Sequence, residues 1–176
     1  MVSVLCDADF FDGSYQHLAE ARQACDLPLL CKEFIIDEIQ LDCARAYGAD
    51  AVLLIARCGT MDKLALLQQA ALERGLLPLV EIATLEESRW VRELQCPIVG
   101  VNARDLDTLQ VDPGQATEVL ASLPRGCARV HLSGLKTAAD VSRISQLGAD
   151  AALIGEILMR QDDPESLLVS LVAAAK

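Results

Sequence analysis

The sequence has 176 residues, enough for one domain with a sizeable core, and we expect residues 1–176 to form a single domain. Hydrophobic residues make up 52% of the chain and aromatic residues only 3%, so the core must consist mainly of Leu, Ile, Val and Ala. The net charge of −11 has no basic cluster to offset it, which argues against nucleic acid as a partner. A phosphorylated small molecule remains possible, because backbone N–H groups can bind phosphate.

Seven cysteines form no C-x-x-C pair, and we interpret them as buried thiols in a reducing cytosol. We expect neither a metal site nor any other cofactor. No apolar run approaches the roughly 18 residues of a membrane span. The sequence therefore predicts a soluble, cytoplasmic protein without a membrane partner.

Seven short apolar runs indicate buried strands, and helical segments with clear start and stop signals separate them. The runs are 2–6, 28–34, 51–56, 77–82, 98–102, 129–133 and 151–155. Helix starts are predicted at Ser14, at Asp37 with Gln40, at Thr84 with Glu87, at Asp112 before Pro113 and at Asp163 before Pro164. Gly48, Gly75 and Gly148 mark helix ends.

This strict alternation of strands and helices predicts a parallel sheet, either open and doubly wound or closed as a barrel. An internal repeat favours the barrel, because the Gly-Ala-Asp-Ala of 48–51 recurs at 148–151, each copy running into a strand. Four strand-helix units separate the two copies, as in the halves of an eightfold barrel. We therefore expect a TIM (βα)8-type barrel that is incomplete, with seven parallel strands and the first βα unit absent.

Ligands of such folds collect where the strands end, and Lys32 is the most informative residue there. It lies within the otherwise apolar 29–36 stretch, where an ammonium suits proton transfer. The alternative is a salt bridge with Glu33 or another carboxylate.

Glu81 follows the fourth run and is a candidate general base facing Lys32, or else a member of a simple salt bridge. Asn102 ends the fifth run, where it could hold a substrate oxygen or serve as an ordinary turn residue. Gly134 and Gly155 follow the last two runs and would let N–H groups approach a phosphate, although glycine also serves tight turns for steric reasons.

Several blocks, in order, resemble the indole-3-glycerol phosphate synthase family of tryptophan biosynthesis. Residues 10–14 resemble its F-x-G-S loop, 32–37 its K-D-F-I-I-D block and 48–55 its G-A-D-A-V-L-L-I strand. Glu81 fits its E-V-H strand end, 100–106 its G-I-N-N-R-D-L block and 155–159 its G-E-S-L-M block.

The resemblance implies a carboxy-lyase that decarboxylates 1-(2-carboxyphenylamino)-1-deoxyribulose 5-phosphate and closes its ring to indole-3-glycerol phosphate. Lys32 would be the general acid and Glu81 the acid/base group of the later dehydration, while Asn102 and Ser133 would orient the substrate with support from Arg104. The remaining implied roles are an apolar pocket for the aromatic ring (Phe11, Phe34, Leu106 and Ile154) and a phosphate site (Gly134, Gly155 and the Glu156 backbone).

The sequence also departs from the family pattern, and these departures bear on turnover. The family's E-x-K-x-x-S-P-S block of the first strand is not found, and its E-S-G becomes Leu132-Ser133-Gly134, which removes a carboxylate. Ala83, Ala103 and Ile157 replace the family's His, Asn and Ser.

Two other functions therefore stay open. One is a non-catalytic barrel subunit, because seven strands leave two unpaired edges that a second copy or a partner chain could cover. The other is a different phosphosugar enzyme on the same scaffold, since a fold does not fix its chemistry.

Overall fold

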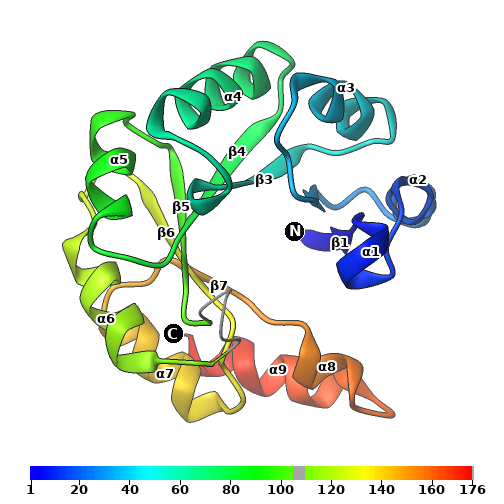
Figure 1. Cartoon of the computed structure of the whole chain (residues 1–176). Helices are drawn as coiled ribbons and strands as arrows, with labels where there is room; N and C mark the ends of the chain where they lie inside the picture. Colours follow the sequence, from blue (N-terminus) through cyan, green and yellow to red (C-terminus); the bar gives the residue numbers. More distant parts are fainter. Residues whose placement is uncertain (105–109, 176) are drawn as a thin grey trace. The chain divides into compact units, whose positions relative to one another are not determined.

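Figure 1 shows a computed structural model of the chain that describes residues 1–104 and 110–175. The strands in these residues coincide with the seven apolar runs, within two residues at each end. They are β1 (Val2–Leu5), β2 (Leu29–Lys32), β3 (Ala51–Ile55), β4 (Leu77–Ile82), β5 (Ile98–Asn102), β6 (Ala128–Leu132) and β7 (Ala151–Leu153). The apolar runs thus form strands as predicted, because each is too short for a stable helix. The strands β2, β3, β4 and β5 are largely buried, whereas β1 and β7 contain only half-buried and exposed residues.

Helices alternate with these strands along the chain, and two helices follow β7. They are α1 (Ala8–Phe11), α2 (Tyr15–Ala24), α3 (Glu38–Ala46), the 3-10 turn η1 (Ala56–Cys58), α4 (Met61–Glu73), α5 (Glu87–Glu93), α6 (Pro113–Ser122), α7 (Ala138–Gln146), α8 (Glu156–Met159) and α9 (Pro164–Ala174). In the described part of the chain, none is long and apolar enough to cross a membrane.

The predicted helix starts and stops are confirmed with one exception: Thr84 and Glu87 exchange the expected hydrogen bonds, but α5 begins at Glu87, three residues later than predicted. The side chains of Ser14, Asp112 and Asp163 accept hydrogen bonds from the first N–H groups of α2, α6 and α9. Asp37 and Gln40 form a reciprocal capping box on α3. At the stops, Gly48, Gly75 and Gly148 have φ of 96°, 69° and 91°, a conformation that glycine adopts without strain.

The chain divides into two compact units. Unit 1 comprises Met1–Glu81 and Leu94–Pro97, and unit 2 comprises Ile82–Glu93 and Ile98–Lys176. In unit 1, β1, β2, β3 and β4 pair in sequence order, all parallel. Figure 1 shows α3 and α4 on the same side of β3 and β4.

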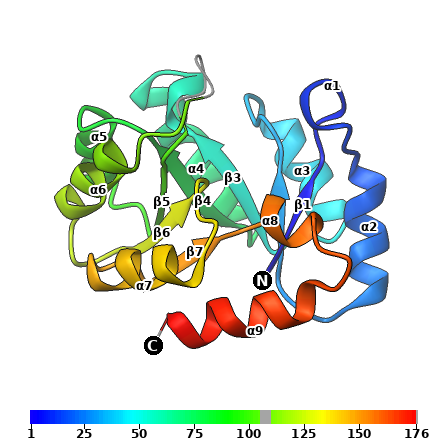
Figure 2. The same cartoon turned by 90° about the horizontal axis from the view of Figure 1, so that it is seen from below.

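Unit 2 repeats the pattern, with β5, β6 and β7 parallel and in order. Its helical layer includes α7 and α9, which pack side by side (Figure 2). The apolar core between them and the sheet contains Leu135, Val141, Ile144 and Leu171.

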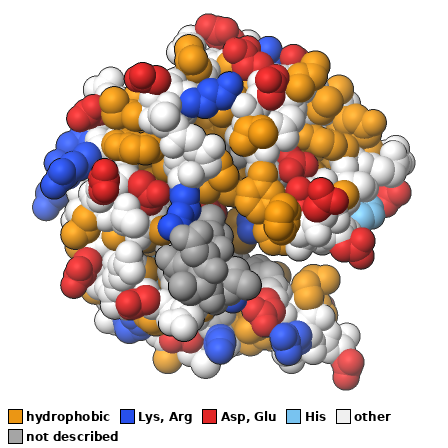
Figure 3. All heavy atoms as spheres, viewed as in Figure 1, with side chains coloured by type: hydrophobic (Ala, Val, Ile, Leu, Met, Phe, Trp, Pro, Cys, Tyr) orange, Lys and Arg blue, Asp and Glu red, His pale blue; other side chains and the backbone are white. Residues whose placement is uncertain are grey.

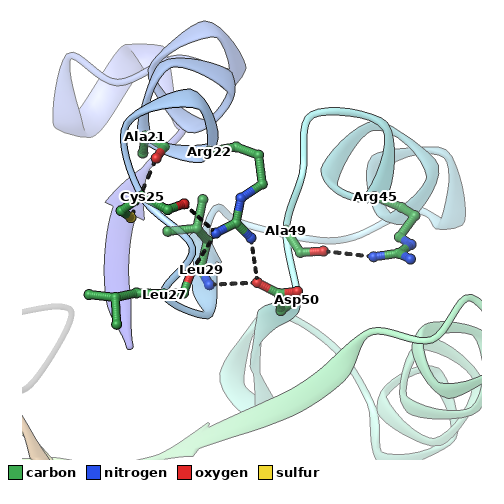
Figure 4. Close-up of polar contacts among 8 residues, drawn as sticks. All are labelled: Ala21, Arg22, Cys25, Leu27, Leu29, Arg45, Ala49 and Asp50. Carbon is green, nitrogen blue, oxygen red and sulfur yellow. Dashed lines mark hydrogen bonds and ion pairs between the residues drawn. The ribbon is translucent and has the colours of Figure 1, made fainter.

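The Gly-Ala-Asp-Ala repeat has the same structural role in both units. The carboxylate of Asp50 accepts a hydrogen bond from the N–H of Leu29 at 2.8 Å, and Asp150 does so from Arg129 at 2.8 Å. Asp50 also pairs with Arg22, as Figure 4 shows. Each aspartate therefore ties the start of its own strand to the start of the preceding strand, a contact that we call the strand-start clamp.

The cysteines correct one expectation. Cys6, Cys31, Cys96 and Cys127 are buried thiols as predicted, but Cys25 and Cys43 are only partly buried and Cys58 is exposed. Cys58 lies in η1, directly beyond the buried end of β3, where the chain turns outward.

Candidate active site

Lys32 and Glu81 lie on the same face of the unit 1 sheet. Residues that pair across parallel strands share a face, and between β3 and β4 Leu53 pairs with Leu79 and Ile55 with Glu81. Cys31 pairs with Val52, so the next position, Lys32, lies opposite Leu53. The two predicted catalytic side chains therefore project from one surface.

The spacing between these residues suits one ligand. Lys32 and Glu81 are two strands apart, about 10 Å across the sheet, and about 7 Å apart along it. Glu81 is only 4% exposed at the end of β4. Although Cys58 is exposed as a whole residue, partial burial of its thiol raises the pKa of that thiol, and the negative charge of Glu81 raises it further. The Glu81 carboxylate therefore lies near η1.

The Lys32 ammonium lies over an aromatic ring. Its Nζ is 5.1 Å from the ring centroid of Phe11, within the range of a cation–π interaction. The salt bridge to Glu33 that the sequence left open does not form among the described residues. The Glu33 carboxylate instead accepts a hydrogen bond from the N–H of Phe34 at 2.8 Å.

All three phenylalanines of the chain meet beside Lys32, and we call Phe10, Phe11 and Phe34 the phenylalanine cluster. Phe11 stacks on Phe34 with centroids 5.5 Å apart and planes at 5°, and Phe10 meets Phe34 edge-on at 5.5 Å. Phe10 is 78% exposed and Phe11 37% exposed. Figure 3 shows hydrophobic side chains at the surface in the region of α1, with acidic side chains beside them.

The loop that carries two of these rings is held against β1. Asp7 caps α1 by accepting a hydrogen bond from the N–H of Phe10 at 2.7 Å, and the N–H of Gly13 bonds to the carbonyl of Asp7 at 2.8 Å. A Cβ on Gly13 would lie 2.4 Å from the carbonyl oxygen of Leu5, so only glycine fits there. The exposed rings are thus presented by a well-anchored segment.

In unit 2, Asn102 and Arg104 form one turn. Asn102 is buried at the end of β5, and its side-chain oxygen accepts a hydrogen bond from the N–H of Arg104 at 2.9 Å. The turn role that the sequence left open is therefore present. The guanidinium of Arg104 lies 3.7 Å from the carboxylate of Glu156.

The predicted phosphate residues lie in turns that follow β6 and β7. Ser133 and Gly134 both have positive φ, 66° and 77°, and Gly155 precedes the first residue of α8, Glu156. Ile154 packs against the core between β7, α7 and α9. Leu106 lies outside the described residues. The binding roles of these residues stay predictions.

Leu132, which stands where the family has a glutamate, shares the face of Asn102, because the two residues pair between β5 and β6. It is buried, and a Cβ added to Gly100 would lie 2.6 Å from it. The leucine therefore packs over Gly100.

Unit 1 also has an apolar cavity between the β2–α3 loop, η1 and α4, with a volume of about 60 Å³. Small-molecule sites usually measure at least about 300 Å³. This cavity is too small for a substrate, so the strand-end groups remain the candidate site.

Comparison with known proteins decides the family. The sequence model of indole-3-glycerol phosphate synthase matches residues 1–171. The chain belongs to the indole-3-glycerol phosphate synthase family. Curated family members include a Rhodopirellula baltica protein that is 42% identical over 173 residues, 98% of this chain and 67% of the relative. A Polynucleobacter asymbioticus member is 40% identical over 98% of this chain and 64% of its own length.

The chain spans only part of the length of these relatives. It covers 64% and 67% of the two proteins just named and 60% of a third indole-3-glycerol phosphate synthase, from Crocosphaera subtropica. Solved structures confirm the TIM-barrel type of α/β fold. The 3-hexulose-6-phosphate synthase of Salmonella typhimurium has a TM-score of 0.81 at 15% identity and covers 98% of this chain and 85% of its own. A 3-keto-L-gulonate-6-phosphate decarboxylase of Vibrio cholerae has a TM-score of 0.74 at 15% identity, covering 98% and 84%. At such identities the likeness concerns the fold alone.

Sequence reasoning identified Phe11 and Phe34 but missed Phe10. A usable signal existed, because the sequence has only three phenylalanines and two of them are adjacent in a polar loop. Two neighbouring exposed aromatic residues in such a loop are unfavourable in water unless they pack together or bind something.

Proposed function

We propose that this chain catalyses the indole-3-glycerol phosphate synthase reaction. The substrate is 1-(2-carboxyphenylamino)-1-deoxyribulose 5-phosphate, and the products are indole-3-glycerol phosphate, carbon dioxide and water. Besides family membership, the observation that carries the proposal is the shared sheet face of Lys32 and Glu81 beside the phenylalanine cluster.

The chemistry follows from that arrangement. The ring carbon that bears the carboxylate attacks the ribulose carbonyl, and the Lys32 ammonium donates a proton to the carbonyl oxygen, which becomes a hydroxyl. The bond to the carboxylate then breaks, and its electron pair restores the aromatic ring as carbon dioxide leaves. Dehydration completes the indole: Glu81 takes a proton from the methylene carbon next to the nitrogen, the electrons of that C–H bond form the ring double bond, and the hydroxyl takes up a proton and departs as water.

Different residues are proposed to bind the aromatic end and the phosphate end of the substrate. Phe11 and Phe34 offer apolar faces for the aromatic ring. For the phosphate we propose Gly134, in the turn after β6, with Gly155 and the backbone N–H of Glu156 at the start of α8, while Ser133 orients the substrate. Asn102, Arg104, Leu106 and Ile154 complete the proposed substrate contacts.

The test is an assay of indole-3-glycerol phosphate fluorescence with the purified chain. We expect turnover that falls at least about a hundredfold in Lys32→Met, because the proton donor is lost. Lys63→Met, which removes an exposed lysine of α4, should retain full activity. No product from the chain alone or after addition of a peptide with the family's E-x-K-x-x-S-P-S block contradicts the proposal.

A second candidate, a barrel subunit completed by another polypeptide, is favoured by the edge of β1. The N–H groups of Val2 and Cys6 bond to the chain of β2, so Ser3 and Leu5 turn their main-chain groups the other way. No strand in the described residues pairs with that edge, and Leu5 is exposed. Under this candidate, a second copy or partner chain adds a strand there. An oligomer in light scattering, with no product in the fluorescence assay with or without the peptide, supports this non-catalytic candidate, and a strictly monomeric particle at micromolar concentration contradicts it.

We also propose that the chain works in the cytoplasm. All seven cysteines are free thiols, which fits a reducing compartment.

A further inference from the structure

The ammonium of Lys32 has an unusual partner for a cation in so acidic a chain. Among the described residues its neighbour is the ring of Phe11, with Nζ 5.1 Å from the centroid, and none of the described carboxylates forms an ion pair with it. Acidic side chains are nevertheless abundant in this region, since Asp7, Asp9 and Asp12 belong to the same loop as Phe11.

The ring of Phe11 has a fixed orientation. It stacks on Phe34 with an interplanar angle of 5°, and Phe34 in turn receives the edge of Phe10. The loop itself is fixed by the Asp7 cap and by the contact of Gly13 with Leu5. A long lysine side chain at a strand end has many rotamers, and a fixed π-face limits them.

We infer that Phe11 is a positioning residue for Lys32: its π-face holds the ammonium at the end of β2 in the geometry that proton donation requires. This role rests on the proposed function and adds to the ring-binding role of Phe11. A π-face also leaves the ammonium open to an anionic substrate, whereas a carboxylate partner would compete with the carboxylate and phosphate of the ligand.

The first test is spectroscopic and does not depend on activity. The chain has four lysines, so protein grown with ε-13C-labelled lysine gives few signals, and Lys32→Arg assigns the signal of residue 32. A methylene held over an aromatic face is shifted upfield by the ring current. We expect Phe11→Leu to move the Lys32 signal downfield toward those of the other lysines, and Phe11→Tyr to retain the upfield position.

Phe10→Leu is the matched control, because Phe10 lies in the same turn and meets Phe34 rather than Lys32. It should leave the Lys32 signal nearly unchanged. An equal shift in both leucine variants, or none in Phe11→Leu, overturns the inference.

The second test is kinetic. Loss of a cation–π contact of this kind should lower kcat about three- to thirtyfold in Phe11→Leu, and Phe11→Tyr or Phe11→Trp should restore most of it. A variant that changes KM alone, with kcat intact, would restrict Phe11 to ring binding and overturn the positioning role. If the wild-type chain shows no turnover at all, the proposed function fails while the Lys32 signal still decides the role of Phe11.

Discussion

His131 is a titratable residue whose burial changes its pKa. It is buried in β6, and its Nδ1 has no hydrogen-bond partner among the described residues. Burial, together with the charge of Arg143, lowers the pKa of His131 below its usual 6.5, while Asp140 acts in the opposite direction. This histidine is therefore a core residue rather than a catalytic one.

That environment predicts a dependence of stability on pH. Because the folded chain resists protonation of His131, the unfolded chain binds more protons as the pH falls below about 6.5. The stabilisation is complete above that value and is lost as the pH falls toward the lower folded pKa. Urea unfolding at about pH 7.5 and pH 5.5 should show a smaller loss of stability in His131→Leu than in the wild-type chain. His17→Leu, which leaves His131 in place, should keep the wild-type difference, and equal losses in all three proteins would refute this account.

Leu132 is one of the residues at which the sequence departs from the family pattern. It is buried on the face of Asn102, packed over Gly100. The sequence showed the replacement but not its packing, because the neighbour of Leu132 comes from a different strand. The same holds for Phe10 and Phe34, which are 24 positions apart and meet only in the folded chain.

At the level of elements, the strand-start clamps make a specific prediction. In Asp50→Ala the buried N–H of Leu29 loses its acceptor and Arg22 loses its carboxylate partner, which should lower the free energy of unfolding by about 2 kcal/mol. Asp150→Ala should cost about 1 kcal/mol, because its side-chain contact with Arg129 is longer, at 3.4 Å. Chemical denaturation measures both.

Asp26→Ala is the control for the clamps, since Asp26 is exposed and belongs to no clamp. We expect a change within about 0.5 kcal/mol. If Asp50→Ala changed the free energy of unfolding as little as this control does, the clamp would not stabilise the fold.

The elements that the sequence predicted best are those with two independent signals. Strands had apolar runs bounded by polar residues, and α3 had both a capping box and a terminal Gly48. The one-turn helices α1 and α8 were not predicted, because four residues are too few to show a helical period. That Lys32 and Glu81 share a face also required the register of three strands, which local sequence does not determine.

At the scale of the whole molecule, the composition is consistent with the place of the aromatic residues at the candidate site. A core of aliphatic side chains leaves the few aromatic residues available for other roles, and the three phenylalanines gather beside Lys32, which ends β2. The acidic surface in Figure 3 discourages polyanions in general, so binding of an anionic substrate must depend on a few oriented groups. The two residues proposed for proton transfer, Lys32 and Glu81, both belong to unit 1.

The central claim is that Lys32 and Glu81 act on one molecule beside the phenylalanine cluster. The most direct measurement is a crystal structure of the chain with indole-3-glycerol phosphate bound. The account predicts the indole ring against Phe11 and Phe34, with the Lys32 ammonium and the Glu81 carboxylate both within about 4 Å of the ligand. A ligand that contacts only one of these two groups, or neither, would contradict it.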